Sequence, residues 1–290
     1  LGHANEDGLA SVDPEASVVF VMNHRSNMDY VLVAYLAASR TALSYAVGEW
    51  ARIWPLQTLI RSLGAYFVRR NSGDALYRRV LERYVAMATA AGVVQAVYPE
   101  GGLSKDGHLR PPRLGLLNYM LKALEKDGAK DVVFVPVGIN YDRVFEDRSL
   151  VRSLDKEAER RTTGFALKKT FGFIGHNFRL MATGKWYRFG YACVNFGAPV
   201  SARDWMANHE ALDEEAQRES IEELGQHLMT RVGQVVPVLP VSLIATVFAN
   251  RPDERISELD LKAAAYAIKT RLETQGTQIY VPHADADYAL

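Results

Sequence analysis

The chain has 290 residues, of which 48% are hydrophobic and 23% charged, and its 34 basic residues balance its 34 acidic ones. This composition is typical of a globular protein and excludes a disordered, collagen-like or disulfide-rich chain. A pI near 7.2 and a single cysteine, Cys193, disfavour a nucleic-acid-binding protein, an internal disulfide and a cysteine-based metal site.

The neutral total is a sum of segregated charges. Residues 52–83 hold 7 basic and 2 acidic residues, and residues 143–188 hold 11 and 5. Residues 189–223 reverse the balance, with 2 basic and 8 acidic residues. A solvated helix face explains each segment as well as a surface for anionic lipid headgroups or an acidic carrier does, so both interpretations stay open.

Apolar runs and helical periodicity alternate along the chain. Strands are predicted at residues 18–22, 65–68, 93–98, 132–137 and 191–196. Apolar residues that recur every three or four positions predict helices at 28–39, 75–91, 114–125, 204–232 and 257–274, the last with Ser257 as its N-cap. Near-continuous apolar strands separated by helices predict an α/β fold with a mixed, mostly parallel central sheet flanked by helices.

No segment has the simple pattern of a transmembrane helix. Residues 232–250 carry no charge but contain Pro237 and Pro240, so we predict a buried or pocket-lining segment, with membrane-surface contact as the alternative. Residues 50–63 are amphipathic, and Trp50 and Trp54 suit a headgroup boundary, although core packing explains most of that apolar face.

The sharpest chemical signal is the string NHRSNMD at residues 23–29. His24 follows the end of a predicted strand, where α/β sheets commonly place ligand sites, and Asp29 starts the next helix. A tight turn between them brings the carboxylate to the imidazole, where it fixes the tautomer of a general base. Taken alone, the spacing is a weak signal that is better explained by a helix-capping aspartate beside an ordinary histidine.

Further polar residues lie at the ends of the other predicted strands. Residues 64–70 read GAYFVRR, residues 98–105 read YPEGGLSK, and residues 135–139 read VPVGI. Arginine forks match phosphate oxygens in pairs, and glycines let backbone amides approach an oxyanion. The strand ends therefore offer a base, a cationic phosphate clamp and a flexible turn.

In this order and spacing, the four blocks closely resemble the glycerolipid acyltransferase family, in its bacterial and mitochondrial-type glycerol-3-phosphate acyltransferase branch. The resemblance runs from residue 18 to residue 142 and continues more weakly through residues 191–199 and 236–241. It implies the acyltransferase-like α/β fold and a catalytic dyad of His24 and Asp29.

The resemblance also implies roles for the remaining block residues. It assigns phosphate binding to Arg69, Arg70 and Lys105, and it places Pro136 on the acyl-donor side. The other substrate-binding candidates are Arg25, Ser26, Glu100, Gly101, Gly102 and Ser104.

One position departs from the family pattern. Relatives commonly carry a basic residue directly after the two glycines, where this chain has Leu103, and Lys105 stands where they often have arginine. Because a lysine is a point charge and lacks the arginine fork, one phosphate contact is in question. Arg113, after two prolines, is a candidate to compensate.

The implied reaction is acyl transfer from acyl-CoA or acyl-carrier protein to the sn-1 hydroxyl of glycerol 3-phosphate, the first step of phospholipid synthesis. It requires no metal and no cofactor beyond the acyl thioester. The alternatives are acylation of dihydroxyacetone phosphate or lysophosphatidate, and a non-catalytic lipid- or phosphate-binding module. Residues 64–70 and the long carboxyl-terminal extension favour glycerol 3-phosphate.

The expected organisation is one acyltransferase domain over residues 1–290, with its motifs in 18–142 and an extension in 186–290. Residues 141–185 are the candidate linker. Because position 1 is Leu and no signal peptide follows, we expect an excised portion of a longer chain. The expected location is the cytoplasmic face of a membrane, in peripheral or monotopic association, with no nucleic-acid partner.

Overall fold

The computed structural model of the chain describes residues 3–5, 12–37, 43–48, 56–62, 64–69, 72–125, 128–144, 150, 190–209 and 213–282. Its strands are β1 (His3–Asn5), β2 (Ser17–Met22), β3 (Ser44–Gly48), β4 (Ala65–Val68), β5 (Gln95–Val97), β6 (Val132–Tyr141), β7 (Ala192–Phe196) and β8 (Val200–Ser201). Its helices are α1 (Asp29–Ala37), α2 (Leu56–Ser62), α3 (Ala75–Ala90), α4 (Gly115–Leu121), α7 (Ala202–Asn208), α8 (Glu214–Val235), α9 (Pro240–Asn250) and α10 (Glu258–Thr274). A 3₁₀ turn, Lys122–Glu125, continues α4.

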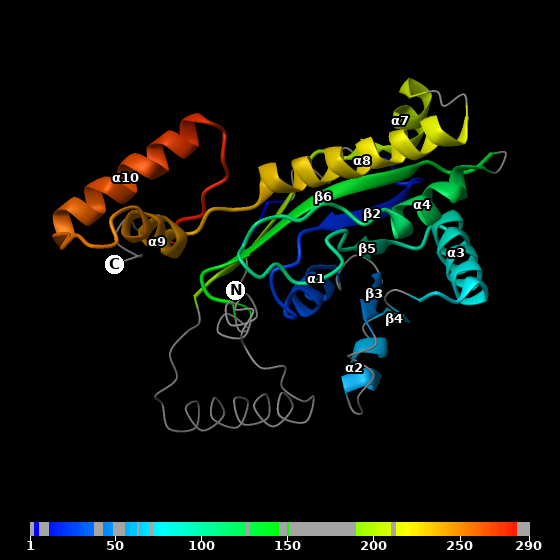
Figure 1. Ribbon diagram of the computed structural model, residues 1–290, viewed down its shortest axis with the longest axis horizontal. Coiled ribbons are helices and arrows are strands. Elements are labelled where there is room, and N and C mark those ends of the chain that lie inside the picture. Colours follow the sequence, from blue (N-terminus) through cyan, green and yellow to red (C-terminus); the bar gives the residue numbers. More distant parts are fainter. Residues whose placement is uncertain are drawn as a thin grey trace.

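The strands form a single eight-stranded sheet in the order β1-β7-β6-β2-β5-β3-β4, with β8 paired to β6 (Figure 1). Strands β6, β2, β5, β3 and β4 run parallel to one another, whereas β7 and β8 pair with β6 in the antiparallel direction. The predicted mixed, mostly parallel sheet is therefore confirmed. Because parallel strands end at one edge, the loops after β2, β4 and β5 meet there.

Helices cover both faces of this sheet. On one face, α4 and α8 pack over β2 and β6, and Figure 1 shows α8 running along these strands. The core of this face contains Val19, Phe134, Leu117 and Leu228, which are at most 1% exposed. On the other face, α1 contributes Tyr30 and Val33 to a second core, which consists of Met22, Tyr30, Val33, Leu43, Tyr45, Val47, Ala65, Ala96, Val137, Ile139 and Val194.

Most predicted elements coincide with observed ones. The five predicted strands correspond to β2, β4, β5, β6 and β7, and Ser257 does cap α10 by accepting a hydrogen bond from Asp260 N. The short strands β1, β3 and β8 and the helices α2 and α9 were not predicted. Strand β3 alternates half-buried and buried residues, but its sequence SYAVG contains only three consecutive apolar residues, Tyr45 to Val47, and so lacks a longer apolar run.

The single helix predicted over residues 204–232 is wrong. The segment holds two helices, α7 and α8, and each has its own N-cap. Ser201 accepts a hydrogen bond from Asp204 N, and Asp213 accepts one from Ala216 N. A second side-chain cap within an acidic stretch marks a new helix start, which periodicity alone does not reveal.

The apolar segment at residues 232–250 is also divided. Helix α8 ends at Val235 and α9 begins at Pro240, the position where a helix tolerates proline. Leu243 and Val247 are buried, but none of the described residues of this segment lines the cavity that lies beside His24. Among the described helices, none has the length and apolarity needed to cross a bilayer. Trp50, Trp54 and most of the candidate linker at 141–185 lie outside the described residues.

Strand β6 meets the end of α8 at Gly138. A Cβ atom at this position would collide with the Val235 carbonyl group, so only glycine allows the helix to approach the strand this closely. We expect Gly138→Ala to lower the free energy of unfolding by about 2 kcal/mol or more through overpacking.

The matched control is Gly73→Ala, because a Cβ at Gly73 meets no atom within 4 Å. Urea unfolding of both variants measures the difference. Equal stability of the two variants would contradict the proposed close approach of α8.

Candidate active site

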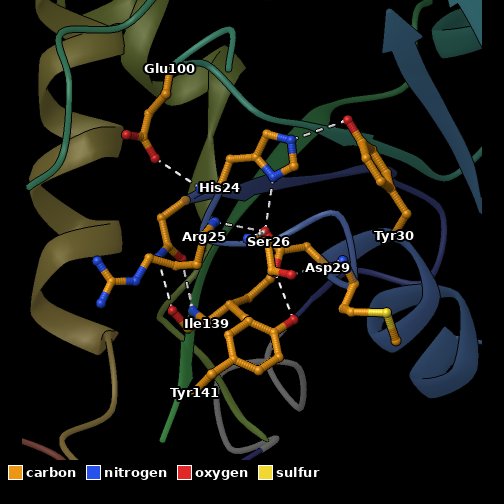
Figure 2. Close-up of polar contacts among 10 residues, drawn as sticks. His24, Arg25, Ser26, Asp29, Tyr30, Glu100, Ile139 and Tyr141 are labelled. Carbon is orange, nitrogen blue, oxygen red and sulfur yellow. Dashed lines mark hydrogen bonds and ion pairs between the residues drawn. The ribbon is translucent and has the colours of Figure 1, made fainter. Parts of the chain in front are cut away.

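The imidazole of His24 and the carboxylate of Asp29 form a buried pair. His24 lies just after β2 and Asp29 is the first residue of α1, so the short turn between them brings the two side chains together. Their Nδ1 and Oδ2 atoms are 2.9 Å apart, and the residues are 3% and 0% exposed (Figure 2). The predicted pairing of these two residues is therefore present in the structure.

Asp29 is held by donors from two parts of the chain. Its Oδ2 atom accepts hydrogen bonds from His24 and from the backbone amides of Arg25 (2.7 Å) and Ser26 (3.1 Å). Its Oδ1 atom accepts one from the hydroxyl of Tyr141, at the end of β6, at 2.6 Å. Because a carboxylate only accepts, His24 carries its proton on Nδ1, and the lone pair of a neutral imidazole is on Nε2.

The Nε2 atom of His24 faces tyrosine side chains. The Tyr30 hydroxyl lies 3.2 Å from Nε2 and donates a hydrogen bond to it. The Tyr98 ring packs against the imidazole with centroids 4.3 Å apart, and Tyr30 stacks on the buried Tyr45. These rings fix the plane of the imidazole, so Nε2 is directed at the Tyr30 hydroxyl, and both His24 and Tyr30 line a cavity.

Glu100 and Ser104 hold the backbone around His24. The Glu100 carboxylate accepts hydrogen bonds from His24 N at 2.9 Å and from Arg110 N at 3.2 Å, and burial raises the pKa of this carboxyl. Ser104 N donates to the His24 carbonyl oxygen, and its hydroxyl donates to the His108 carbonyl oxygen. Both residues were predicted to bind substrate, but the bonds described here join one loop to another.

Arg25 makes a similar structural bridge. Its guanidinium donates to the carbonyl oxygen of Gly107 at 2.8 Å and to Oδ1 of Asn140, on β6, at 3.2 Å. Burial lowers the pKa of Arg25, with Asp29 and Glu100 acting in the opposite direction. The hydroxyl of Ser26 accepts from Met28 N within the same turn. Neither Arg25 nor Ser26 is among the described residues that line the main cavity.

The cavity beside His24 has a volume of about 310 Å³. Its apolar walls are formed by side chains from five segments, among them Val47, Val68, Leu81, Val97, Leu116 and Leu117. Arg69, Arg78 and Arg113 also line it, and all three are exposed to solvent. The cavity therefore combines a base at its wall with apolar surface and guanidinium groups.

Two of the predicted substrate-binding candidates, Gly101 and Gly102, line this cavity. Gly101 has a φ of 67°, and a Cβ there would lie 2.6 Å from Cδ of Arg113. Glycine at this position is thus needed both for the turn and for the placement of the Arg113 side chain.

The structure brings together only part of the predicted phosphate clamp. Arg69 lines the cavity, with its guanidinium 5.5 Å from the centroid of the Tyr77 ring, whereas Arg70 lies outside the described residues. Lys105 is half-buried and is not among the described lining residues. Pro136 is buried within β6, where its carbonyl oxygen accepts from Gly197 N at 2.7 Å, and it does not appear in this lining either.

Three residues of the site were not singled out from the sequence. Tyr30 directly follows Asp29, the last residue of the first block, and Tyr141 lies two residues after the fourth block, so nearness to motif residues was the available signal. Arg78 reaches the cavity from α3, and no pattern in the sequence distinguishes it from its neighbour Arg79. Among the described residues, no cluster of three or more His, Cys, Asp or Glu side chains is placed to hold a metal ion.

Comparisons with known proteins agree with the motif blocks. Residues 4–140 match the acyltransferase family model, and residues 178–287 match that of the glycerol-3-phosphate acyltransferase C-terminal region. The chain is 30% identical to a glycerol-3-phosphate acyltransferase of Xanthomonas axonopodis pv. citri over 270 residues, which cover 89% of this chain and 29% of that protein. A second such protein, from Pseudomonas syringae pv. syringae, is 27% identical over 96% of this chain and 33% of its own length.

The chain thus spans about a third or less of these curated relatives. Among solved structures, the 1-acyl-sn-glycerophosphate (LPA) acyltransferase PlsC of Thermotoga maritima is similar with a TM-score of 0.43 and 18% identity. The similarity covers 80% of this chain and 73% of that one.

Tyr141 provides a test of how Asp29 is held. We expect Tyr141→Phe to lower the free energy of unfolding by about 1 to 3 kcal/mol, because it removes a hydrogen bond to a buried carboxylate. Denaturant unfolding near neutral pH measures this loss. The control is Tyr266→Phe on α10, a residue that is 65% exposed and should lose almost nothing. An equally small loss in both variants would show that the Tyr141 hydroxyl does not stabilise Asp29.

Proposed function

Because the chain belongs to the acyltransferase family, we propose that it transfers an acyl group from acyl-CoA or acyl-carrier protein to the sn-1 hydroxyl of glycerol 3-phosphate. The product is lysophosphatidate, as in the first step of phospholipid synthesis. The observation that carries this proposal is the His24–Asp29 pair, in which His24 lines a cavity that arginines also line. These groups supply a base for a hydroxyl and cations for a phosphate within one cavity.

The proposed chemistry is general-base catalysis by His24. Nε2 takes the proton of the acceptor hydroxyl while its oxygen bonds to the thioester carbonyl carbon. Collapse of the tetrahedral intermediate breaks the carbon–sulfur bond, and the imidazolium returns the proton to the departing thiolate. Asp29 orients the ring and stabilises its charged form, so neither a covalent acyl-enzyme nor a cofactor beyond the thioester is proposed.

The Tyr30 hydroxyl defines where the acceptor must bind. It donates to Nε2, and the acceptor hydroxyl has to take its place to lose a proton to the same lone pair. The Gly101 amide donates to the Tyr98 carbonyl oxygen. We therefore assign stabilisation of the oxyanion to the neighbouring amide of Gly102, which also lines the cavity.

The proposed phosphate site consists of the arginines that line the cavity. Arg69 follows β4 and Arg113 follows the third block, so two separate segments supply guanidinium forks to the same space. Arg113 thereby provides the arginine that Leu103 and Lys105 do not. Phosphate roles for Arg70 and Lys105, and an acyl-donor role for Pro136, remain predictions from the family pattern.

We further propose that the protein works at the cytoplasmic face of a membrane, in peripheral or monotopic association. The acceptor is water-soluble, but the product carries a long acyl chain and partitions into a bilayer. Lysophosphatidate and dihydroxyacetone phosphate are the competing acceptors, since both also combine a hydroxyl with a phosphate.

The function is tested by transfer of a labelled acyl group from acyl-CoA to each of the three acceptors. We expect glycerol 3-phosphate to be preferred, and His24→Ala to lower the rate by about 10²- to 10⁴-fold through loss of the base. The control is His209→Ala, at the C-cap of α7, a residue that is not among those that line the cavity. Preference for lysophosphatidate would defeat the proposed acceptor.

Near-normal transfer by a folded His24→Ala variant would defeat the proposed mechanism. Tight binding of glycerol 3-phosphate without turnover, in the presence of acyl-CoA, would instead indicate a non-catalytic binding module. Circular dichroism and the unfolding midpoint establish that the variant is folded.

Arg113 provides the test of the phosphate site. We expect Arg113→Ala to raise the KM for glycerol 3-phosphate by about 10- to 100-fold, because a charged hydrogen bond to phosphate is lost. The matched control is Arg218→Ala on α8, whose side chain is 83% exposed and far along the sequence from the site. An unchanged KM in the Arg113 variant would remove Arg113 from the phosphate site.

A further inference from the structure

Helix α3 exposes a row of large apolar side chains to solvent. Leu76, Val80, Tyr84 and Met87 are 73%, 59%, 50% and 54% exposed, respectively. Their spacing of four, four and three residues places them on one face of the helix. We call these four residues the α3 stripe. A contiguous apolar stripe on a helix surface, unlike a single exposed leucine, marks a surface of interaction.

The side of α3 that is buried against the rest of the molecule lies opposite the stripe. Val85 and Thr89, on the opposite side of the helix, are fully buried, and Val85 belongs to the core beneath α4 and β5. Helix α3 is therefore apolar on two sides, although Tyr84 of the stripe also contacts the Tyr66 ring on β4. An amphipathic surface helix would carry polar residues on its second side.

Basic residues adjoin the stripe. Arg79 and Arg83 follow Leu76 and Val80 by three residues each, so they lie beside the stripe on the helix surface. Glu82 is the single acidic residue of α3, and it is paired with Arg79 at 2.9 Å and with Lys122 at 2.8 Å. Lys122 comes from the turn after α4, so the charge around the stripe is positive.

The same helix lines the cavity. Tyr77, Arg78 and Leu81 of α3 contribute to its wall, within one or two turns of the stripe. A surface that holds α3 at a bilayer would therefore place the cavity next to the lipid phase. Under the proposed function, this arrangement shortens the path by which an acyl chain enters and lysophosphatidate leaves.

We propose that the α3 stripe, with Arg79 and Arg83, binds the surface of an anionic phospholipid bilayer. The apolar side chains enter the boundary between headgroups and acyl chains, and the two guanidinium groups contact the phosphates. The purpose of this contact rests on the proposed acyltransferase function, but lipid binding itself is measured without catalysis.

The test is co-sedimentation of the 290-residue chain with vesicles of phosphatidylcholine containing about one third phosphatidylglycerol, compared with pure phosphatidylcholine. The stripe variant carries Leu76→Ser, Val80→Ser and Met87→Ser. Tyr84 is kept because its ring contacts that of Tyr66, with centroids 5.4 Å apart. We expect the unmodified chain to bind the anionic vesicles, and the stripe variant to bind them about tenfold or more weakly.

The matched control carries Leu259→Ser and Tyr266→Ser on α10, two apolar residues that are 77% and 65% exposed. It should bind vesicles as the unmodified chain does. No vesicle binding by the unmodified chain, equal binding by the stripe variant, or an equal loss in the α10 control would each overturn the proposal. Only variants whose unfolding midpoint matches that of the unmodified chain are compared.

A second variant separates charge from apolar insertion. Arg79→Gln with Arg83→Gln should weaken binding to the anionic vesicles by about tenfold, and should reduce the preference over phosphatidylcholine. An unchanged preference would overturn the part assigned to the arginines.

The two proposals fail separately. Acyl transfer to glycerol 3-phosphate from a short-chain, water-soluble acyl-CoA, measured without lipid, should be retained by the stripe variant. Retained transfer with unchanged vesicle binding would refute the lipid-binding surface alone. Stripe-dependent vesicle binding without any transfer by the unmodified chain would refute the proposed function alone.

Discussion

The buried carboxylate of Asp29 is the constraint around which the site is arranged. Burying a carboxylate completely costs free energy unless its oxygens accept hydrogen bonds in place of those from water. The carboxylate of Asp29 is 0% exposed and accepts four hydrogen bonds. Three come from the turn that it ends, and the fourth comes from Tyr141 on another strand. The hydrogen bond to His24 therefore exists only when β2, α1 and the end of β6 are correctly assembled.

The motif blocks serve this arrangement in a second way. Glu100 binds the backbone amide of His24, Ser104 binds its carbonyl oxygen, and Arg25 joins the loop after the third block to β6. Asn23 adds a two-way bond with Ile139, at 2.9 and 2.7 Å. Side chains that a motif suggests as substrate ligands thus fix the loops that position His24. Their loss would act on catalysis through the orientation of the imidazole.

Charge is distributed around the cavity in a way that the neutral total conceals. Arg69, Arg78 and Arg113 meet at the cavity, and Arg79 and Arg83 lie on the outer side of α3. The basic stretch at residues 52–83 therefore supplies two of the three cavity arginines as well as the two on the outer side of α3. The cavity arginines suit a small phosphate, and the outer pair adjoins apolar side chains that face solvent. The basic stretch at 143–188 lies almost wholly outside the described residues.

The sequence by itself determined the α/β class, the positions of five strands and the His24–Asp29 pair. These features are local: an apolar run predicts a strand, and a five-residue turn brings two side chains together. The tertiary structure decided the rest. Short strands such as β3 are stabilised by neighbours distant in the sequence, the break between α7 and α8 depends on two separate caps, and Tyr141 reaches Asp29 only because β6 pairs with β2. Likewise, burial and pairing in space decided that Arg25 and Glu100 join loops, whereas Arg113 lines the cavity.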